Sequence, residues 1–465
     1  TLRAWNWRGD DYGVGPGLAL ALDPRGSADA DNYLVDLSWG RNLNGADSKL
    51  ELHASWMDVE TTTRQRLFPA GSVLPIGADG NLNTDPLTSL PMVFVDGMIG
   101  NPEFYEEHWR LDAVLTHTGF DKHQLRLAAG TSYQEETARE SKNYGPGVLD
   151  LANRDPACFQ PFCVVGGAVT DVSGTPNIFM NDQDRTLWYL SVQDQWRVAP
   201  DWDLTLGLRY DRYSDFGTTL NPRIALVWNT AQNLTSKLLY GRAFRAPSFA
   251  ELFVINNPVA LGNEDLEPEV INTVEMAFDY RPGFDLRTGF NLFWYQVEDL
   301  IEFVPTASGL VASNVGEQRG YGVELEADWQ PHPDLKLHAN YAWQNSEDQL
   351  SDTDVADTPA HQAYLRAIWR LPNRWTLQGD WRWIADRSRA AGDPRPAIDD
   401  YHWANVSIGY GALQGRLDLR LHLRNVFDES AREPAPAAAV PGGSLIPGDF
   451  PLEERHARIS VSYRL

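Results

Sequence analysis

The stretch Leu239–Glu269, LYGRAFRAPSFAELFVINNPVALGNEDLEPE, decides the fold of this chain. A strand is predicted for Leu234–Ala246, which begins just before this stretch and overlaps its start. Apolar side chains alternate along one face of this segment. Pro247 ends this strand, because proline has no N–H to give to a sheet ladder. Gly262 lies in the loop that follows, and Glu269–Tyr280 is predicted to be the next strand. The stretch is therefore a strand, a loop and a second strand.

An ordered set of residues in this stretch resembles the box found in TonB-dependent outer-membrane receptors. The matching residues are Gly241, Phe244, Arg245, Ala246, Pro247, Phe249, Glu251, Leu252, Gly262, Asn263, Leu266, Pro268 and Glu269. A weaker resemblance is Leu423–Asp428, which is similar to a stretch in the penultimate strand of that family. The alternative for Leu239–Glu269 is an ordinary strand–loop–strand of another β protein.

The resemblance implies a transmembrane antiparallel β-barrel of about 22 strands around a plug. It also implies a receptor that binds a metal chelate outside the cell and imports it. Energy would arrive through a periplasmic TonB complex that acts on the plug. The location would be the outer membrane of a Gram-negative bacterium, with outer-membrane lipid around the wall.

Composition favours an outer-membrane barrel over other classes. The chain has 17 Trp, 17 Tyr and 18 Phe, yet its mean hydropathy is -0.39. No run of eighteen apolar residues exists, so transmembrane helices are excluded. Barrel strands alternate apolar and polar residues and carry aromatic girdles, which gives both features at once. A secreted propeller would show a repeat of about 40–50 residues, and none is found.

Charge excludes one class of partner. The formal net charge is -25, so nucleic acid is not an expected partner. Acidic residues gather between apolar segments, as in Asn345–Asp357, which is either a solvated loop or a divalent-cation site.

Cys158 and Cys163 are separated by four residues, and we expect a disulfide between them in an oxidising compartment. Metal binding there would need more ligands than this loop supplies.

Clean alternation appears in several segments of the chain and is cleanest near the C-terminus. In Arg416–Arg424, leucines occupy one face and charged residues the other. In a barrel the leucines meet lipid and the charges meet a wet lumen. The same pattern recurs in Asp203–Asp211, Asp334–Trp343, Arg374–Trp383 and Arg455–Leu465.

The links between these strands alternate between short and long. Long links are expected near 10–30, 61–102, 140–184, 248–266, 305–315, 348–358, 389–399 and 429–454, with a short exception at 214–219. Outer-membrane barrels have short periplasmic turns and longer external loops, so we place the long links outside the cell. The count predicts about eighteen strands.

The ends of the chain carry a further expectation. Thr1 follows no leader, so the resemblance implies one domain, residues 1–465, that is a barrel fragment lacking the signal peptide, the plug and about four strands. The strands at Leu2–Trp7 and Arg455–Leu465 should then not pair fully as neighbours. Arg455–Leu465 also resembles the signal read by the barrel-assembly machinery, although Leu465 stands where the family usually has an aromatic residue.

No catalytic constellation, resident cofactor or metal site is predicted, and the chain is not expected to be an enzyme. His108, His117 and His123 lack metal-ligand spacing.

The candidates for contact with an anionic iron–siderophore complex are cationic and aromatic: Arg139, Tyr144, Arg242, Arg245 and Phe253. Ser248–Leu261 contains no histidine, whereas haem receptors of the family carry one there. The predicted function is import of a ferric siderophore, and the alternatives are a passive porin or a receptor for cobalamin or another scarce nutrient.

Overall fold

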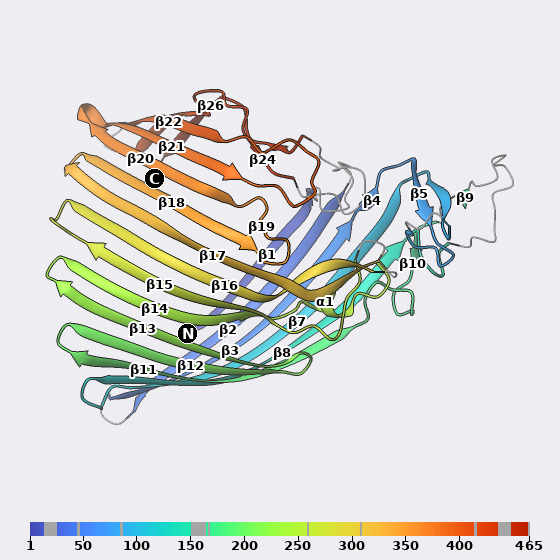
Figure 1. Ribbon diagram of the computed structural model, residues 1–465, viewed down its shortest axis with the longest axis horizontal. Coiled ribbons are helices and arrows are strands. Elements are labelled where there is room, and N and C mark those ends of the chain that lie inside the picture. Colours follow the sequence, from blue (N-terminus) through green and yellow to red (C-terminus); the bar gives the residue numbers. More distant parts are fainter. Residues whose placement is uncertain are drawn as a thin grey trace.

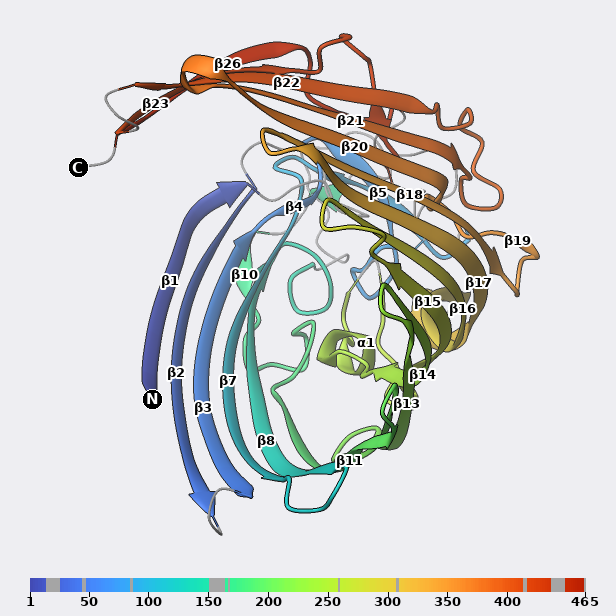
Figure 2. The same ribbon diagram turned by 90° about the vertical axis from the view of Figure 1, so that its left-hand side faces the viewer.

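The computed structural model describes residues 1–13, 26–43, 47–83, 87–149, 164–165, 168–257, 260–306, 309–412, 416–435 and 448–463. They form an antiparallel wall that curves around a central space (Figures 1 and 2). No helix among these residues has the length and apolar character needed to cross a membrane.

The wall is a sheet of 21 strands, three of which are only two or three residues long. Its long strands are β1 (Leu2–Gly13), β2 (Ser27–Leu43), β3 (Ser48–Arg64), β7 (Met98–His117), β8 (His123–Lys142), β11 (Gln183–Ala199), β12 (Trp202–Tyr213), β13 (Gly217–Ala231), β14 (Leu234–Arg245), β15 (Glu269–Tyr280), β16 (Leu286–Thr306), β17 (Gly309–His332), β18 (Leu335–Asp348), β20 (Pro359–Leu371), β21 (Trp375–Arg387), β22 (Tyr401–Ala412), β23 (Leu417–Arg424) and β26 (His456–Tyr463). The short ones are β4 (Arg66–Phe68), β10 (Thr170–Asp171) and β19 (Thr353–Asp354). The predicted all-β barrel wall of about eighteen strands is confirmed for the described residues.

The two faces of the wall follow from alternation. Leu238, Leu325 and Leu421 are 46–47% exposed on the outer face, where water would penalise them and lipid would not. Each long strand pairs with its neighbour in sequence, as in the ladder Leu419↔Tyr410 between β23 and β22. Asp418, the residue before Leu419, lies on the opposite, inner face of β23. There it accepts a hydrogen bond from Arg420 at 2.6 Å.

The links agree with the predicted alternation, except that several of the predicted long links contain strand. The segment 305–315 is not a loop: β16 and β17 continue as a hairpin to Thr306 and Gly309. Phe303 and Val304, which favour strands, pair there with Ala312 and Val311. The link 61–102 also contains strand, namely β4, β5 (Ser72–Ile76) and β6 (Leu90–Phe94).

A separate small core lies beyond the external end of the wall. There β6 pairs with β5 and, in parallel, with β9 (Val164–Val165). Its buried side chains are Leu67, Leu74, Ile76, Met92, Phe94, Met98 and Tyr144. Figure 1 shows this external subdomain at the right, projecting past the wall. Two further short strands, β24 (Arg432–Glu433) and β25 (Phe450–Pro451), pair in the last long link.

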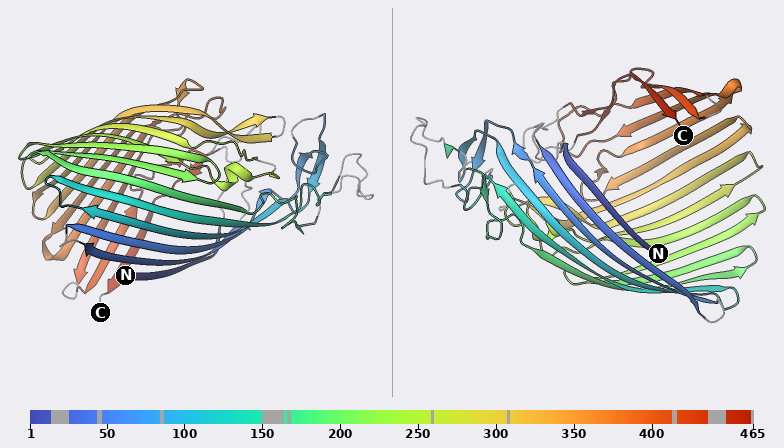
Figure 3. Two further views of the ribbon diagram at one scale, coloured as in Figure 1. Left: turned by 90° about the horizontal axis from the view of Figure 1, so that it is seen from below. Right: turned by 180° about the vertical axis from the view of Figure 1, so that it is seen from behind.

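The two edges of the wall are not joined. Within the described residues, β1 pairs with β2 and β26 pairs with β23, and no ladder links β1 to β26. Figure 2 and the right-hand view of Figure 3 show these two strands apart. The prediction that the first and last strands do not pair fully is confirmed for these residues.

Candidate functional site

The stretch Leu239–Glu269 forms a clamp at the external end of the wall. Arg245, the last residue of β14, faces Glu269, the first residue of β15, in the ladder. Its Nε and Nη2 atoms donate to the two Glu269 oxygens at 2.6 Å each. Its Nη1 and Nη2 atoms also donate to the two Glu251 oxygens at 2.9 Å each. One guanidinium thus ties two strands to the following loop, with the planar geometry that only arginine provides.

Glu251 belongs to a short helix, α1 (Phe249–Phe253), which Figure 2 draws within the ring of strands. Pro247 cannot extend β14, and Ser248 then caps the helix: its hydroxyl accepts the Glu251 N–H while Glu251 accepts the Ser248 N–H. Burial alone would raise the pKa of Glu251, but hydrogen bonds from Arg245 and Ser248 outweigh it and lower that pKa. Glu251 is therefore held as a carboxylate that both caps α1 and anchors Arg245.

The second half of the box closes back on α1. The Gly262 N–H donates to Val254 O at 2.7 Å, and the Asn263 N–H donates to Glu251 O at 2.9 Å. A Cβ on Gly262 would lie 2.7 Å from the Leu252 carbonyl atoms, so only glycine fits. Leu266 completes the closure by packing, fully buried, with Leu252 and the hairpin residue Ala312. Gly262, Asn263 and Leu266 thus hold the loop closed against α1.

Arg185, on β11, is a side chain in contact with the clamp that the sequence reasoning missed. Its guanidinium is 11% exposed and pairs with Asp215 at 2.6 Å. It also donates to Pro247 O at 2.8 Å and lies 4.7 Å from the centre of the Phe249 ring. Arg185 therefore fixes the start of α1 from the neighbouring wall. A single arginine after a long loop carries no sequence signal that would have singled it out.

The residues after α1 dock on the external segment 172–182. The Ile255 N–H donates to Phe179 O at 2.8 Å. The Asn256 side chain donates to Pro176 O at 2.8 Å and to Ile178 O at 2.9 Å. Ile178 and Phe179 pack in one apolar cluster with residues of α1. Two external segments that are far apart in sequence thus share backbone contacts.

A buried ion pair supports this docking. Lys142 and Glu140, at the external end of β8, are paired at 3.0 Å with side-chain exposures of 0% and 3%. Glu140 accepts the Phe179 N–H at 2.8 Å, and the Lys142 Nζ atom lies 3.5 Å from Asn256 O. Each ion of the pair therefore contacts one of the two docked segments. Removing one ion alone would leave a buried charge without a partner.

The five predicted ligand residues do not converge. Arg245 and Phe253 lie together at the clamp, where Phe253 is half-buried between two apolar clusters. Tyr144 is 2% exposed in the external subdomain, and burial raises the pKa of its hydroxyl. Arg242 is exposed, on the face of β14 opposite to Arg245. Their contact with a ligand stays a prediction.

Arg139 lines a cavity. Its guanidinium carbon is 4.9 Å from the centre of the Tyr105 ring. The cavity, of about 700 Å³, lies between β8 and segment 173–182 and is bounded by Thr137, Ser173, Asn181 and Asp182.

Cys158 and Cys163 lie outside the described residues, so their disulfide also stays a prediction.

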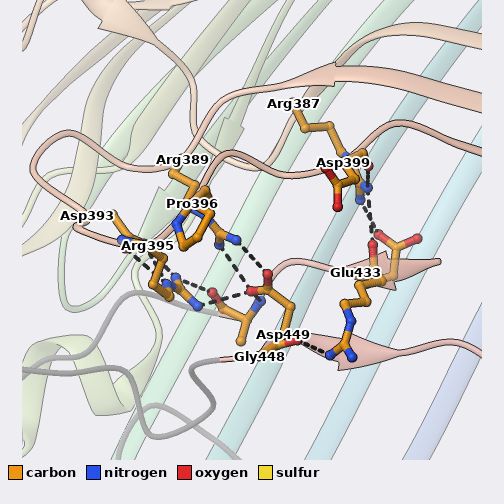
Figure 4. A network of polar contacts seen from close by, with 11 residues as sticks. Arg387, Arg389, Asp393, Arg395, Pro396, Asp399, Glu433, Gly448 and Asp449 are labelled. Atoms are coloured by element: carbon orange, nitrogen blue, oxygen red, sulfur yellow. Dashed lines mark hydrogen bonds and ion pairs between the residues drawn. The ribbon is translucent and has the colours of Figure 1, made fainter. Parts of the chain in front are cut away.

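A second polar network joins the last two external links, shown in Figure 4. Arg389 donates to both Asp449 oxygens at 3.1 and 2.5 Å, and Arg395 donates to one of them at 3.1 Å. Arg387 donates to Glu433 at 2.9 Å. Hydrogen bonds from Arg389 lower the pKa of Asp449, and those from Arg395 lower the pKa of Asp393 to about 2. The carboxylates of this network are thus paired with arginines of the same chain.

The acidic segment Asn345–Asp357 is mostly solvated. Leu350 and Ser351 N–H groups bond to Asp348, and Asp354 accepts the Ser388 hydroxyl at 2.9 Å. Burial raises the pKa of Asp357. Within the described residues, no three metal-ligating side chains converge in this segment.

Comparison with known proteins places the chain among membrane receptors. Residues 2–426 match the family model described as TonB dependent receptor-like, beta-barrel. An iron-regulated outer membrane virulence protein of Vibrio cholerae is 23% identical over 271 residues, which are 52% of this chain and 41% of that protein. Heme/hemopexin utilization protein C of Haemophilus influenzae is 27% identical over 301 residues, 56% of this chain and 40% of that protein. The chain thus spans less than half the length of these curated relatives.

A solved structure shows the same fold. The ferric-catecholate import receptor Fiu from E. coli K12 superposes with a TM-score of 0.65 at 14% identity. The alignment covers 94% of this chain and 64% of that receptor. At this identity the likeness concerns the fold.

Proposed function

The chain belongs to the TonB-dependent receptor family, and from this premise we propose that it is the wall of a receptor that imports a ferric siderophore. Its place is the outer membrane of a Gram-negative bacterium, and its family consists of receptors and transporters. In this proposal a periplasmic TonB complex supplies the energy. The metal chelate binds at the external mouth, and the barrel-assembly machinery inserts the wall into lipid.

The clamp at Arg245 is the observation that carries this proposal. A passive pore needs a stable wall, but it does not need an ordered helix inside its mouth. Here Arg245, Arg185 and the Gly262 closure hold α1 against the wall. An internal support of this kind suits a receptor whose mouth must present a fixed surface to a ligand.

Two features favour a siderophore over other cargoes. Arg139 faces a cavity of about 700 Å³, and a guanidinium suits the oxygen-rich, often anionic chelates of iron. Ser248–Leu261 contains no histidine that could ligate haem iron. Cobalamin, which is not an anionic iron chelate, would gain less from Arg139.

Growth assays test the proposal. An iron-starved host carrying the full-length receptor gene should grow on one or more members of a panel of ferric siderophores and take up radioactive iron from them. Uptake should vanish in a host without TonB. The matched control is the same host supplied with haem or with cyanocobalamin as the limiting nutrient.

Each rival has its own outcome. Growth on haem or cobalamin alone would overturn the siderophore assignment but keep the receptor. Uptake that continues without TonB would instead support a passive porin. Loss of uptake in Arg139→Gln, with Arg242→Gln unchanged, would assign the Arg139 cavity to the ligand.

A further inference from the structure

A cluster of metal-ligating side chains lies far from the external mouth, on the inner face of β17 and β18. Glu326, Asp328 and His338 each offer one ligand atom, and these atoms lie within 4.8 Å of one another. We propose that this cluster binds a divalent transition-metal cation such as Zn²⁺ from the lumen. The inference goes beyond the proposed import function and does not depend on it.

Alternation places the cluster in the lumen. Tyr321, Leu325 and Trp329 are 44–50% exposed on the outer face of β17, so Glu326 and Asp328 lie on the opposite face. In the ladder Asp328 stands directly across from His338. The short turn 333–334 joins the two strands just below, which puts the cluster near the periplasmic end of the wall.

The chemistry of the set suits a borderline cation. Imidazole is preferred by Zn²⁺, Ni²⁺ and Cu²⁺, and carboxylates complete such sites. The His338 Nδ1 atom is 2.8 Å from Asp328, and the Asn340 amide lies 3.5 Å from Nε2, so both ring nitrogens have orienting neighbours. Atoms that bind Zn²⁺ at about 2.1 Å stand about 3.4 Å apart, so small rotations of these side chains suffice.

The carboxylates of the cluster are only partly offset by a neighbouring arginine, Arg287. Among the described residues, the Glu326 carboxylate has no ion pair and no hydrogen bond. Arg287, which faces Asp328 from β16, makes its direct ion pair with Asp279 at 3.1 Å and acts on Glu326 and Asp328 only as a nearby charge. Gly289 faces Glu326 in the same ladder and adds no side chain to cover it. The site is therefore open to a cation from the lumen.

One cation nearby works against the site and gives a sharp test. Arg366, on β20, stands directly across from His338. Its positive charge raises the energy of any metal ion held beside it. Replacing it by Gln should therefore tighten metal binding, whereas a purely structural role of the cluster predicts no such gain.

The experiment uses the full-length receptor, extracted in detergent and freed of bound cations with EDTA. We expect one equivalent of Zn²⁺ by calorimetry, and Co²⁺ absorption bands from nitrogen and oxygen ligands. Glu326→Gln and His338→Asn should each weaken binding by at least about tenfold, and Arg366→Gln should strengthen it severalfold. The matched control is His332→Ala, because His332 lies on the same hairpin with its Nδ1 atom 3.7 Å from Asp334 but outside the cluster.

Three results would overturn the proposal. One is the absence of binding by the parent protein at millimolar Zn²⁺. The second is unchanged binding in both Glu326→Gln and His338→Asn. The third is equal loss in His332→Ala. Resistance to heat-induced unfolding on gels checks that each variant retains its barrel.

Discussion

At the scale of single residues, the box depends on contacts that only certain side chains can make. Gly262 sits against the carbonyl of Leu252, and Arg245 meets two carboxylates at once. Arg245 was predicted as a ligand contact, yet each of its three guanidinium nitrogens donates to a carboxylate of the same chain. The sequence can place such an arginine near the external mouth. It cannot tell whether the guanidinium binds a ligand or a carboxylate of the same chain.

Gly262→Ala should destabilise the clamp. The new Cβ would lie 2.7 Å from backbone atoms of Leu252, so α1 or the loop must shift, at a cost of about 1–3 kcal/mol. The control is Gly241→Ala, because no atom lies within 4 Å of a Cβ there. Urea unfolding in detergent micelles measures both. Equal midpoints for the two variants would refute the close contact.

Arg245→Met should lower the free energy of unfolding by about 2 kcal/mol, because charge-assisted hydrogen bonds to two half-buried carboxylates are lost. Arg245→Lys keeps the charge but not the planar fork, so it should recover only part of this loss. Arg242→Met, on the exposed opposite face, should change little. A full recovery by lysine would mean that charge alone matters.

At the scale of elements, alternation predicted the wall well. The strand Glu269–Tyr280 begins and ends as expected, and β14 ends one residue before the predicted Ala246. Period-two patterns carry this information because one face meets lipid along the whole strand. The hairpin 305–315 was missed because Pro305 and Gly309 look like loop residues, whereas tertiary contacts extend the ladder. The Asn256 docking and the Arg185 contacts join distant segments and leave no local pattern.

Asn256→Ala should loosen segment 172–182. The variant loses both amide hydrogen bonds to Pro176 and Ile178, although the Ile255 backbone bond remains. Hydrogen exchange of peptides from 172–182 should therefore rise, while that of β8 stays unchanged. Asn340→Ala, near the other end of the wall, is the control. Unchanged exchange in 172–182 would show that the docking needs no side chain.

The faces of β23 can be tested with two neighbouring residues. Leu419→Arg should cost about 2–4 kcal/mol if it lies at the bilayer midplane, because it places a charge against lipid. Asp418→Asn, on the lumen face, should cost much less, since it weakens the contact with Arg420 without placing a charge against lipid. Folding titrations in lipid vesicles measure both. Comparable losses would mean that the faces are reversed.

At the scale of the whole molecule, acid should release the last external links from each other. The pKa values of Asp449 and Asp393 are lowered by arginine hydrogen bonds, to about 2 for Asp393. A lowered pKa stabilises the folded form above the ordinary value near 3.8, and this contribution disappears as pH falls toward 2. After correction for the intrinsic exchange rate at each pH, the protection of the peptides around 389–399 and 448–453 should thus fall between about pH 4 and pH 2.

Asp449→Asn provides the matched control for this prediction. It removes the charge at every pH, so at pH 7 it should show the rapid exchange that the parent protein shows only in acid. Its protection from exchange, corrected for the intrinsic rate, should also lose most of the pH dependence in that range. A parent protein with the same protection at pH 2 and pH 6 would contradict the assignment.

The docking of Ile255 and Asn256 on segment 172–182 has an immunological consequence. Residues from two distant parts of the chain form one continuous external patch, so antibodies raised against the intact receptor should recognise a discontinuous epitope. A linear peptide from either segment would lack the other half of that epitope. Sera raised against such peptides should therefore bind denatured receptor on a blot better than intact cells.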